Sequence, residues 1–249
     1  MKNFLEKISN GINNITRGTT SAVILCAGSS TRFSQGNGSK QMAEVCGKPV
    51  ILHTLSAFEA SECISEIILV VRKEDIEPFK ELVTANNIKK VKHIVAGGTT
   101  RQQSAAIGFK NISQKSGYVA VHDGARCLIT PEIISQVTTV AHRFKAATAA
   151  TKSTDTVKMA DKRGFISKTI DRELVWNVQT PQIFEKKLYN VSLHYAKANN
   201  IEVTDDCMMA ESAGFKVKLV DTGKENIKIT FKSDIALAEQ ILASRRDDK

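Results

Sequence analysis

Two cations stand in a loop that is built mostly from glycine and small polar residues. The loop follows the apolar run AVILCA at 22–27 and reads GSSTRFSQGNGSK from Gly28 to Lys40, with Arg32 and Lys40 as its only charges. Backbone N–H groups can approach an anion in such a loop, and an arginine fork or a lysine point charge can complete the neutralisation. The stretch fits a phosphate-binding loop, and on its own it fits a solvated turn equally well.

Two common nucleotide-binding motifs do not occur in this loop. Positions 28, 30 and 33 are Gly, Ser and Phe, whereas the dinucleotide fingerprint needs three glycines, and no G-K-[ST] of a Walker loop follows. A dehydrogenase is therefore disfavoured. Cys26 adjoins the loop, but the five cysteines form no C-x-x-C pair, so zinc binding and a thiol nucleophile are poorer interpretations.

Strand-like apolar runs alternate with helical patterns in the first part of the chain. We expect strands at 21–27, 66–71, 91–96 and 118–126, and helices at 49–61, 74–86, 100–111 and 131–145. This order indicates a Rossmann-like α/β fold, with a mostly parallel sheet and helices on both faces. Ligands of such sheets bind beyond the carboxyl ends of the strands, where the polar loops 27–40, 97–104 and 122–126 fall.

The second half of the chain changes character. Strand-like pieces around the turn DKRG predict a hairpin or arm that protrudes from the sheet at about 150–175. A helix near 185–198, strands at 215–220 and 226–230, and a closing helix at 233–242 with Ser233 and Asp234 as its cap are expected to follow. We expect one domain over residues 21–249, preceded by an extension of residues 1–20.

The amino-acid composition limits the kinds of molecule that the protein is expected to bind. The chain has 249 residues, 42% of them apolar, and a net charge of +9. No apolar run approaches the roughly 20 residues that span a bilayer, and the first residues do not resemble a secretory signal, so we expect a cytoplasmic protein without a membrane partner. The basic residues are scattered, which favours small phosphorylated substrates over nucleic acid.

A series of motifs in a fixed order resembles one enzyme family. The chain reads LCAGSSTRF, SKQ, GKPVILHTL, VAGGTTRQQSAAIG (95–108), VHDGAR (121–126), TIDRELVWNVQTPQIF (169–184), TDD (204–206) and ENIKIT (225–230). Together these resemble the 2-C-methyl-D-erythritol 4-phosphate cytidylyltransferases of isoprenoid biosynthesis, over residues 21–243. Ser39 stands where the family usually has a proline before the lysine.

The resemblance implies a nucleotide site. Arg32, Lys40 and Lys228 match cations that hold the triphosphate and stabilise the transition state, and Asp123 matches a ligand of Mg²⁺. The residues that match the nucleotide-binding loops are Ala27, Gly28, Gly98, Thr99 and Ser104. The implied reaction is attack by the acceptor phosphate on the α-phosphorus of CTP, with release of pyrophosphate.

The resemblance also implies an acceptor site shared between two subunits. Arg126, Thr180 and Thr204, together with Lys228, match residues around the methylerythritol phosphate. Thr156 and Arg172, on the arm, match residues that reach the neighbouring subunit's site, so a homodimer is implied. Two other functions remain open: a cytidylyltransferase for ribitol 5-phosphate, and a non-catalytic nucleotide-binding regulator.

Several polar residues in these motifs have structural interpretations. We expect His122 to be a satisfied buried histidine, because a substrate phosphate oxygen is already a nucleophile and needs no general base. Arg101 is expected to brace the loop 97–104, and Trp176 to lie in the core. The acidic residues expected to orient cations and backbone are Asp171, Asp205 and Asp206.

Overall fold

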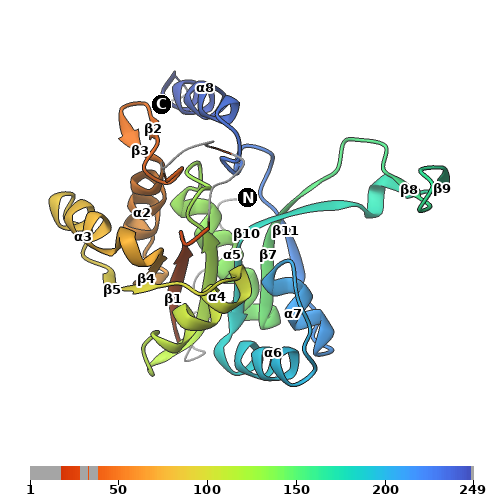
Figure 1. The fold of residues 1–249 in the computed structure, drawn as a ribbon, viewed down its shortest axis with the longest axis horizontal. Coiled ribbons are helices and arrows are strands. Elements are labelled where there is room, and N and C mark those ends of the chain that lie inside the picture. The colour runs from red at the N-terminus through yellow and green to blue at the C-terminus, as the bar shows by residue number, and fades with distance from the viewer. Residues whose placement is uncertain (1–17, 29–32, 34–38, 248–249) are drawn as a thin grey trace, which may run out of the picture.

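The computed structural model describes residues 18–28, 33 and 39–247, and within them seven strands form one central sheet (Figure 1). The strands are β1 Thr19–Leu25, β4 Ile64–Val71, β5 Val91–Ala96, β6 Ser116–Asp123, β7 Ala146–Lys152, β10 Trp176–Glu185 and β11 Lys218–Asp221. Their order is β11-β7-β10-β6-β1-β4-β5. Strand β10 runs antiparallel to both of its neighbours, and the other neighbouring pairs are parallel. The predicted Rossmann-like α/β fold is confirmed.

The register of the central strands places their carboxyl ends level with one another. Leu25, the last residue of β1, pairs with Asp123 of β6 and with Val70 of β4. Val71 in turn pairs with Ala96, the last residue of β5. The polar loops that follow these strands therefore leave the sheet at one edge, as the sequence predicted.

Helices cover both faces of the sheet. One face carries α2 Val50–Ala60, α3 Ile76–Ala85 and α5 Pro131–Phe144, and the other carries α4 Arg101–Lys110, α6 Lys186–Ala198 and α7 Asp206–Ser212. Strand β1 shows why both faces must be covered: Ala22 and Ile24 pack into the first core, and Val23 and Leu25 into the second. A strand that is apolar on both sides is typical of a buried parallel sheet.

The predicted arm is a small hairpin that extends away from the sheet (Figure 1). Strands β8 Lys158–Ala160 and β9 Ile166–Thr169 pair antiparallel, and the short 3₁₀ turn η2 Arg172–Leu174 leads back into β10. Every residue of both hairpin strands is exposed. The hairpin therefore has no core of its own.

The C-terminal helix α8, Ser233–Asp247, packs against two segments near the carboxyl edge of the sheet. Its Glu239 side chain accepts a hydrogen bond from the N–H of Cys46 at 2.9 Å, in the turn between the short strands β2 Glu44–Val45 and β3 Lys48–Pro49. Arg245 donates to the carbonyl of Leu128 at 2.9 Å. Helix α8 thus links the β2–β3 hairpin to the segment that follows β6.

Several local predictions were wrong. Residues 226–230 form no strand; Ile229 instead donates a single backbone hydrogen bond to Ala125 and buries its side chain against α8. Helix α8 begins at Ser233 itself, and Asp234 accepts from amides that precede the helix. Trp176 is half-buried at the start of β10 rather than in the core.

The ends of other predicted segments also shift. The helix expected at 74–86 is a 3₁₀ turn, η1 Lys73–Asp75, followed by α3. Most of the predicted extension 1–20 lies outside the described residues, although Thr19 and Thr20 already belong to β1. None of the described helices combines the length and apolarity that a membrane span requires.

Candidate active site

A cavity of about 590 Å³ opens where the carboxyl ends of β1, β4, β5 and β6 meet. Eight of the residues predicted to act in the nucleotide site line it: Ala27, Gly28, Lys40, Gly98, Thr99, Ser104, Asp123 and Lys228. These residues come from segments that are up to 201 positions apart in the chain. The structure therefore brings the predicted loops together at one cavity. Arg32, the remaining predicted cation, lies outside the described residues.

Lys228 and Asp123 form an ion pair in the cavity wall. The Nζ atom of Lys228 lies 2.7 Å from Oδ2 of Asp123, which is the last residue of β6. Burial of Ile229 and its hydrogen bond to Ala125 fix the backbone beside Lys228. Burial alone would raise the pKa of Asp123, but the charges of Lys228 and Arg101 outweigh it and hold that pKa well below its usual range. The carboxylate is therefore charged at physiological pH.

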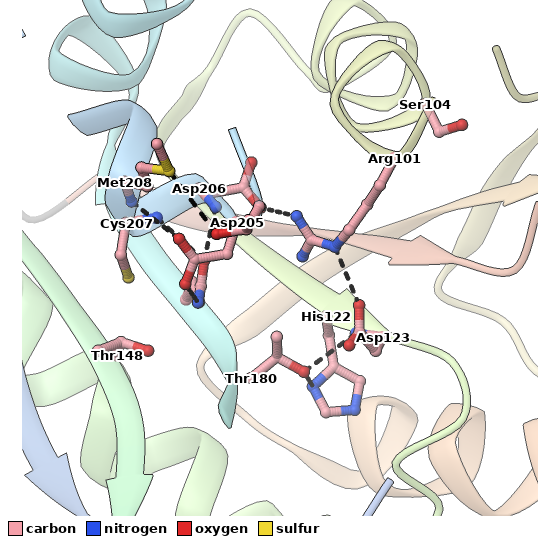
Figure 2. Close-up of polar contacts among 12 residues, drawn as sticks. Arg101, Ser104, His122, Asp123, Thr148, Thr180, Asp205, Asp206, Cys207 and Met208 are labelled. Atoms are coloured by element: carbon pink, nitrogen blue, oxygen red, sulfur yellow. Dashed lines mark hydrogen bonds and ion pairs between the residues drawn. The ribbon is translucent and has the colours of Figure 1, made fainter. Parts of the chain in front are cut away.

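Arg101, at the start of α4, bridges two carboxylates (Figure 2). Its NH1 atom lies 2.7 Å from Oδ2 of Asp206, and its Nε atom lies 3.3 Å from Oδ1 of Asp123. Burial would lower the pKa of Arg101, but the two carboxylates raise it above its ordinary value. The prediction that Arg101 braces the loop 97–104 missed these contacts, which tie α4 to the ends of β6 and α7.

The loop 97–104 is shaped by its own hydrogen bonds. The N–H of Gly98 donates to Ser104 Oγ at 3.1 Å, and the N–H and hydroxyl of Thr99 both donate to Gln103 Oε1. A Cβ atom at Gly97 would overlap the side chains of Ala27 and Ser104. Glycine is therefore required where the residue after β5 meets the segment that follows β1, and the loop is held by its own hydrogen bonds without a ligand.

His122 is a buried, neutral histidine. Its Nδ1 atom lies 3.0 Å from the Thr180 hydroxyl, which also accepts a hydrogen bond from the N–H of Asp123. The Thr180 hydroxyl has one proton and two lone pairs, so it can donate to Nδ1 or accept from it, whereas Nε2 has no partner in the described part of the chain. Burial lowers the pKa of His122 to about 3. The sequence predicted a buried histidine with both ring nitrogens satisfied; Nδ1 has a hydrogen-bond partner, but Nε2 has none in the described part of the chain.

Apart from Lys228, the predicted acceptor residues lie outside the described cavity lining. Arg126 donates to the carbonyl of Asn226 at 2.7 Å, and burial lowers its pKa. Thr180 is buried and holds the backbone of Asp123, whereas Thr204 is exposed just before α7. Thr156 and Arg172 are exposed on the arm. The chain by itself thus gathers its predicted nucleotide residues but leaves the arm residues apart from them.

The family is decided by comparison over nearly the whole chain. The family model described as 2-C-methyl-D-erythritol 4-phosphate cytidylyltransferase (IspD) matches residues 20–244. The chain belongs to this family.

Individual cytidylyltransferases agree with that assignment. The enzyme of Caldanaerobacter subterraneus is 41% identical over 223 residues, which are 89% of this chain and 98% of that one. The enzyme of Alkaliphilus oremlandii is 36% identical and covers 92% of this chain and 98% of its own. The crystal structure of 4-diphosphocytidyl-2C-methyl-D-erythritol synthase from Anaerococcus prevotii superposes with a TM-score of 0.81 at 35% identity, covering 91% and 96% of the two chains.

The predicted resemblance to the methylerythritol cytidylyltransferases is therefore confirmed. The chain is a nucleotidyltransferase of the non-mevalonate isoprenoid pathway. The matches carry the methylerythritol acceptor in their names, which favours it over ribitol 5-phosphate.

Some residues of this cytidylyltransferase site were missed by the sequence reasoning. Arg72 and Glu74 line the cavity directly after β4, and Asp75 holds the Arg72 guanidinium through two hydrogen bonds of 2.7 and 2.9 Å. The rule that placed ligands beyond the carboxyl ends of parallel strands would have found them, because β4 ends at Val71. Further lining residues that were not predicted are Leu25, Phe33, Gln41, Thr100, Arg101, Ala125 and Thr230.

The thiol of Cys26 plays no part in the chemistry of this site. Cys26 directly follows β1 and its side chain is buried in the core, and burial raises the pKa of its thiol far above the ordinary value. A protonated, buried thiol is inert as a nucleophile. This environment agrees with the prediction from the sequence that Cys26 is not a nucleophile.

Proposed function

We propose that the cavity at the carboxyl edge of the sheet binds CTP, and that Lys40 and Lys228 act on its phosphates while the phosphate of 2-C-methyl-D-erythritol 4-phosphate attacks. The observation that carries this proposal is the convergence of Lys40, Lys228 and Asp123 with Gly28 and Gly98 on one cavity of about 590 Å³. Glycines allow close approach of the backbone to a phosphate, and two ammonium groups offset its charge.

The reaction is an in-line displacement at the α-phosphorus of CTP. An oxygen of the acceptor phosphate forms a new P–O bond, the bond between the α-phosphorus and the bridging oxygen breaks, and pyrophosphate leaves with that electron pair. The attacking oxygen is already anionic, so no residue has to remove a proton from it. Catalysis then comes from positioning and from fixed positive charge beside the phosphates, which Lys40 and Lys228 supply.

The cavity wall fits Mg²⁺ only in company with a nucleotide. Within the described ranges, no group of three or more His, Cys, Asp and Glu side chains could hold a metal ion. Mg²⁺ in nucleotide sites commonly takes one or two carboxylates and completes its shell with phosphate oxygens and water. Asp123 supplies such a carboxylate at the cavity. A bound Mg²⁺ would neutralise charge on the triphosphate and orient it.

We propose that the arm pairs with a second copy of the chain. Apolar side chains are exposed along it, namely Met159, Phe165, Ile166 and Leu174. A two-stranded hairpin is marginally stable in water without a packing surface. A two-fold related arm would supply that surface, and it would bring Arg172 and Thr156 to the acceptor site of the partner subunit.

The acceptor residues on the body of the chain are proposed to complete that site. Arg126 comes from the 124–128 segment, Thr180 from β10, and Thr204 from the segment just before α7. A reaction in the cytoplasm, with neither nucleic acid nor a membrane as partner, stays a prediction from the sequence.

The experiment that tests the function is pyrophosphate release from CTP with two acceptors in parallel. We expect rapid release with 2-C-methyl-D-erythritol 4-phosphate and slow release with ribitol 5-phosphate or with no acceptor. Equal rates with ribitol 5-phosphate would contradict the acceptor assignment. No release with either acceptor, despite binding of CTP, would favour a nucleotide-binding regulator.

A further inference from the structure

Asp206 is a buried carboxylate that the proposed reaction does not use. It is 3% exposed and begins α7. Its Oδ1 atom accepts a hydrogen bond of 2.6 Å from the Tyr189 hydroxyl, and its Oδ2 atom lies 2.7 Å from NH1 of Arg101. Its N–H donates to Gln182 Oε1 of β10 at 2.9 Å. Residues of α4 and α6 therefore hold the side chain of Asp206, and a residue of β10 holds its backbone.

The two contacts of Arg101 are unequal. The 2.7 Å distance to Asp206 is that of a charge-assisted hydrogen bond, whereas the 3.3 Å distance to Asp123 is longer than such bonds usually are. Asp206 therefore provides the main counter-charge of Arg101. Without that counter-charge, the guanidinium would be left with Asp123 as its other ion-pair partner.

Two carboxylates line the cavity, Asp123 and Glu74, and Asp123 is the one that Arg101 contacts. Lys228 already occupies its Oδ2 atom, and Arg101 approaches Oδ1. A guanidinium that closed fully onto Asp123 would compete with any cation that enters the cavity with CTP. The distance between Arg101 and Asp123 therefore decides how much of this carboxylate a ligand can use.

We propose that Asp206 is a positioning residue for cytidylyl transfer: it holds Arg101 back from Asp123 and so keeps the Asp123 carboxylate available to CTP and its Mg²⁺. Tyr189 supports the arrangement from the far side, because it holds the other oxygen of Asp206. This inference rests on the proposed function of the cavity. Figure 2 shows Arg101 between the two carboxylates that it joins.

A double-mutant cycle tests whether Asp206 acts through Arg101. The variants are Asp206→Asn, Arg101→Gln and the two combined, and the measurements are kcat/KM for CTP and the calorimetric Kd of CTP with Mg²⁺ in the absence of acceptor. We expect Asp206→Asn to weaken both by about 10- to 100-fold, as is typical for partners that orient a ligand-binding side chain. In the Arg101→Gln background the same change should add no more than about twofold. Losses that multiply in the double variant would overturn the proposal.

Two further variants separate positioning from folding. Asp205→Ala removes the N-cap of α7, which accepts from the N–H of Met208 at 2.8 Å, and the 2.8 Å hydrogen bond from Gln182 Nε2, but it removes none of the side-chain contacts of Arg101 or Asp206. It should lower the melting temperature and change the Kd of CTP by no more than about twofold. If Asp206→Asn likewise lowered the melting temperature with unchanged CTP affinity, Asp206 would be structural only.

Tyr189→Phe keeps the ring packing and the charges and removes only the hydrogen bond to Asp206. It serves as the test if Asp206→Asn does not fold. A smaller loss of CTP affinity in the same direction is expected, and unchanged affinity would contradict the proposal. If the wild-type chain bound CTP with Mg²⁺ but transferred no cytidylyl group, the proposed function would fail while the binding measurements still tested Asp206.

Discussion

Replacement of Lys228 by alanine removes the cation that touches Asp123 at 2.7 Å in the cavity wall. One charge pair at about 4 Å is worth roughly 4 kcal/mol at an effective dielectric constant of about 20. Each 1.36 kcal/mol of lost transition-state stabilisation costs about tenfold in rate, so the full charge corresponds to about a thousandfold. The Lys228 side chain is 36% exposed, and solvent screening reduces its effect. We expect kcat to fall by about 10²- to 10³-fold, the loss typical of one preorganised donor.

The assay is initial-rate pyrophosphate release with saturating CTP and 2-C-methyl-D-erythritol 4-phosphate. Lys224→Ala is the matched control, because Lys224 is an exposed lysine four positions away and does not belong to the described cavity lining. It should behave as wild type. Lys228→Arg should recover part of the rate, since it keeps the charge but not the compact ammonium group. If Lys228→Ala kept a rate within about tenfold of wild type, Lys228 would be a structural partner of Asp123 and not a catalytic cation.

Three more outcomes are expected. Because the pKa of His122 is lowered to about 3 in the folded state, the unfolded chain binds the extra proton first, so stability should fall as pH drops below about 6.5. This loss should reach roughly 2 kcal/mol at pH 5 in urea melts and be missing in His122→Gln. CTP should be used far better than ATP or GTP, and equal turnover of a purine nucleotide would contradict the nucleotide assignment. Inactive Arg172→Ala and Lys40→Ala homodimers should regain about a quarter of wild-type activity after statistical subunit exchange, because each mixed dimer has one intact site. Mixed dimers without activity would place Arg172 in the site of its own chain.

Residues in continuous motifs were predictable, because the chain itself sets their neighbours. Asp123 ends a strand whose apolar pattern is clear, Gly28 and Lys40 belong to the loop after another such strand, and the parallel sheet must bring those strand ends together. Lys228 was found through its motif, although its segment was wrongly expected to be a strand. Alternating apolar residues predict one buried side, but they do not show whether a neighbouring strand supplies hydrogen bonds; Ile229 has a single backbone bond to Ala125 instead.

The contacts of Arg101 could not be predicted from one sequence. Its two carboxylates lie 22 and 105 positions away in the chain, and the bridge depends on how α4, β6 and α7 pack. The sequence around Arg101 therefore contains no signal for contacts with residues so far away in the chain. His122 shows the same limit: burial was expected, but its Thr180 partner comes from the antiparallel strand β10, whose place beside β6 is a property of the topology.

We expect helix α8 to affect turnover, although its residues do not belong to the described cavity lining. It packs on Ile229, the neighbour of Lys228, and through Glu239 it holds the β2–β3 hairpin, which begins a few residues after Lys40. The helix thus connects the segment that carries Lys228 to the hairpin that follows Lys40, and these are the two lysines proposed to contact the triphosphate. Shortening or loosening the C-terminal helix should therefore lower turnover from a distance, because the separation of the two ammonium groups would no longer be fixed. The melting temperature of the sheet should stay the same.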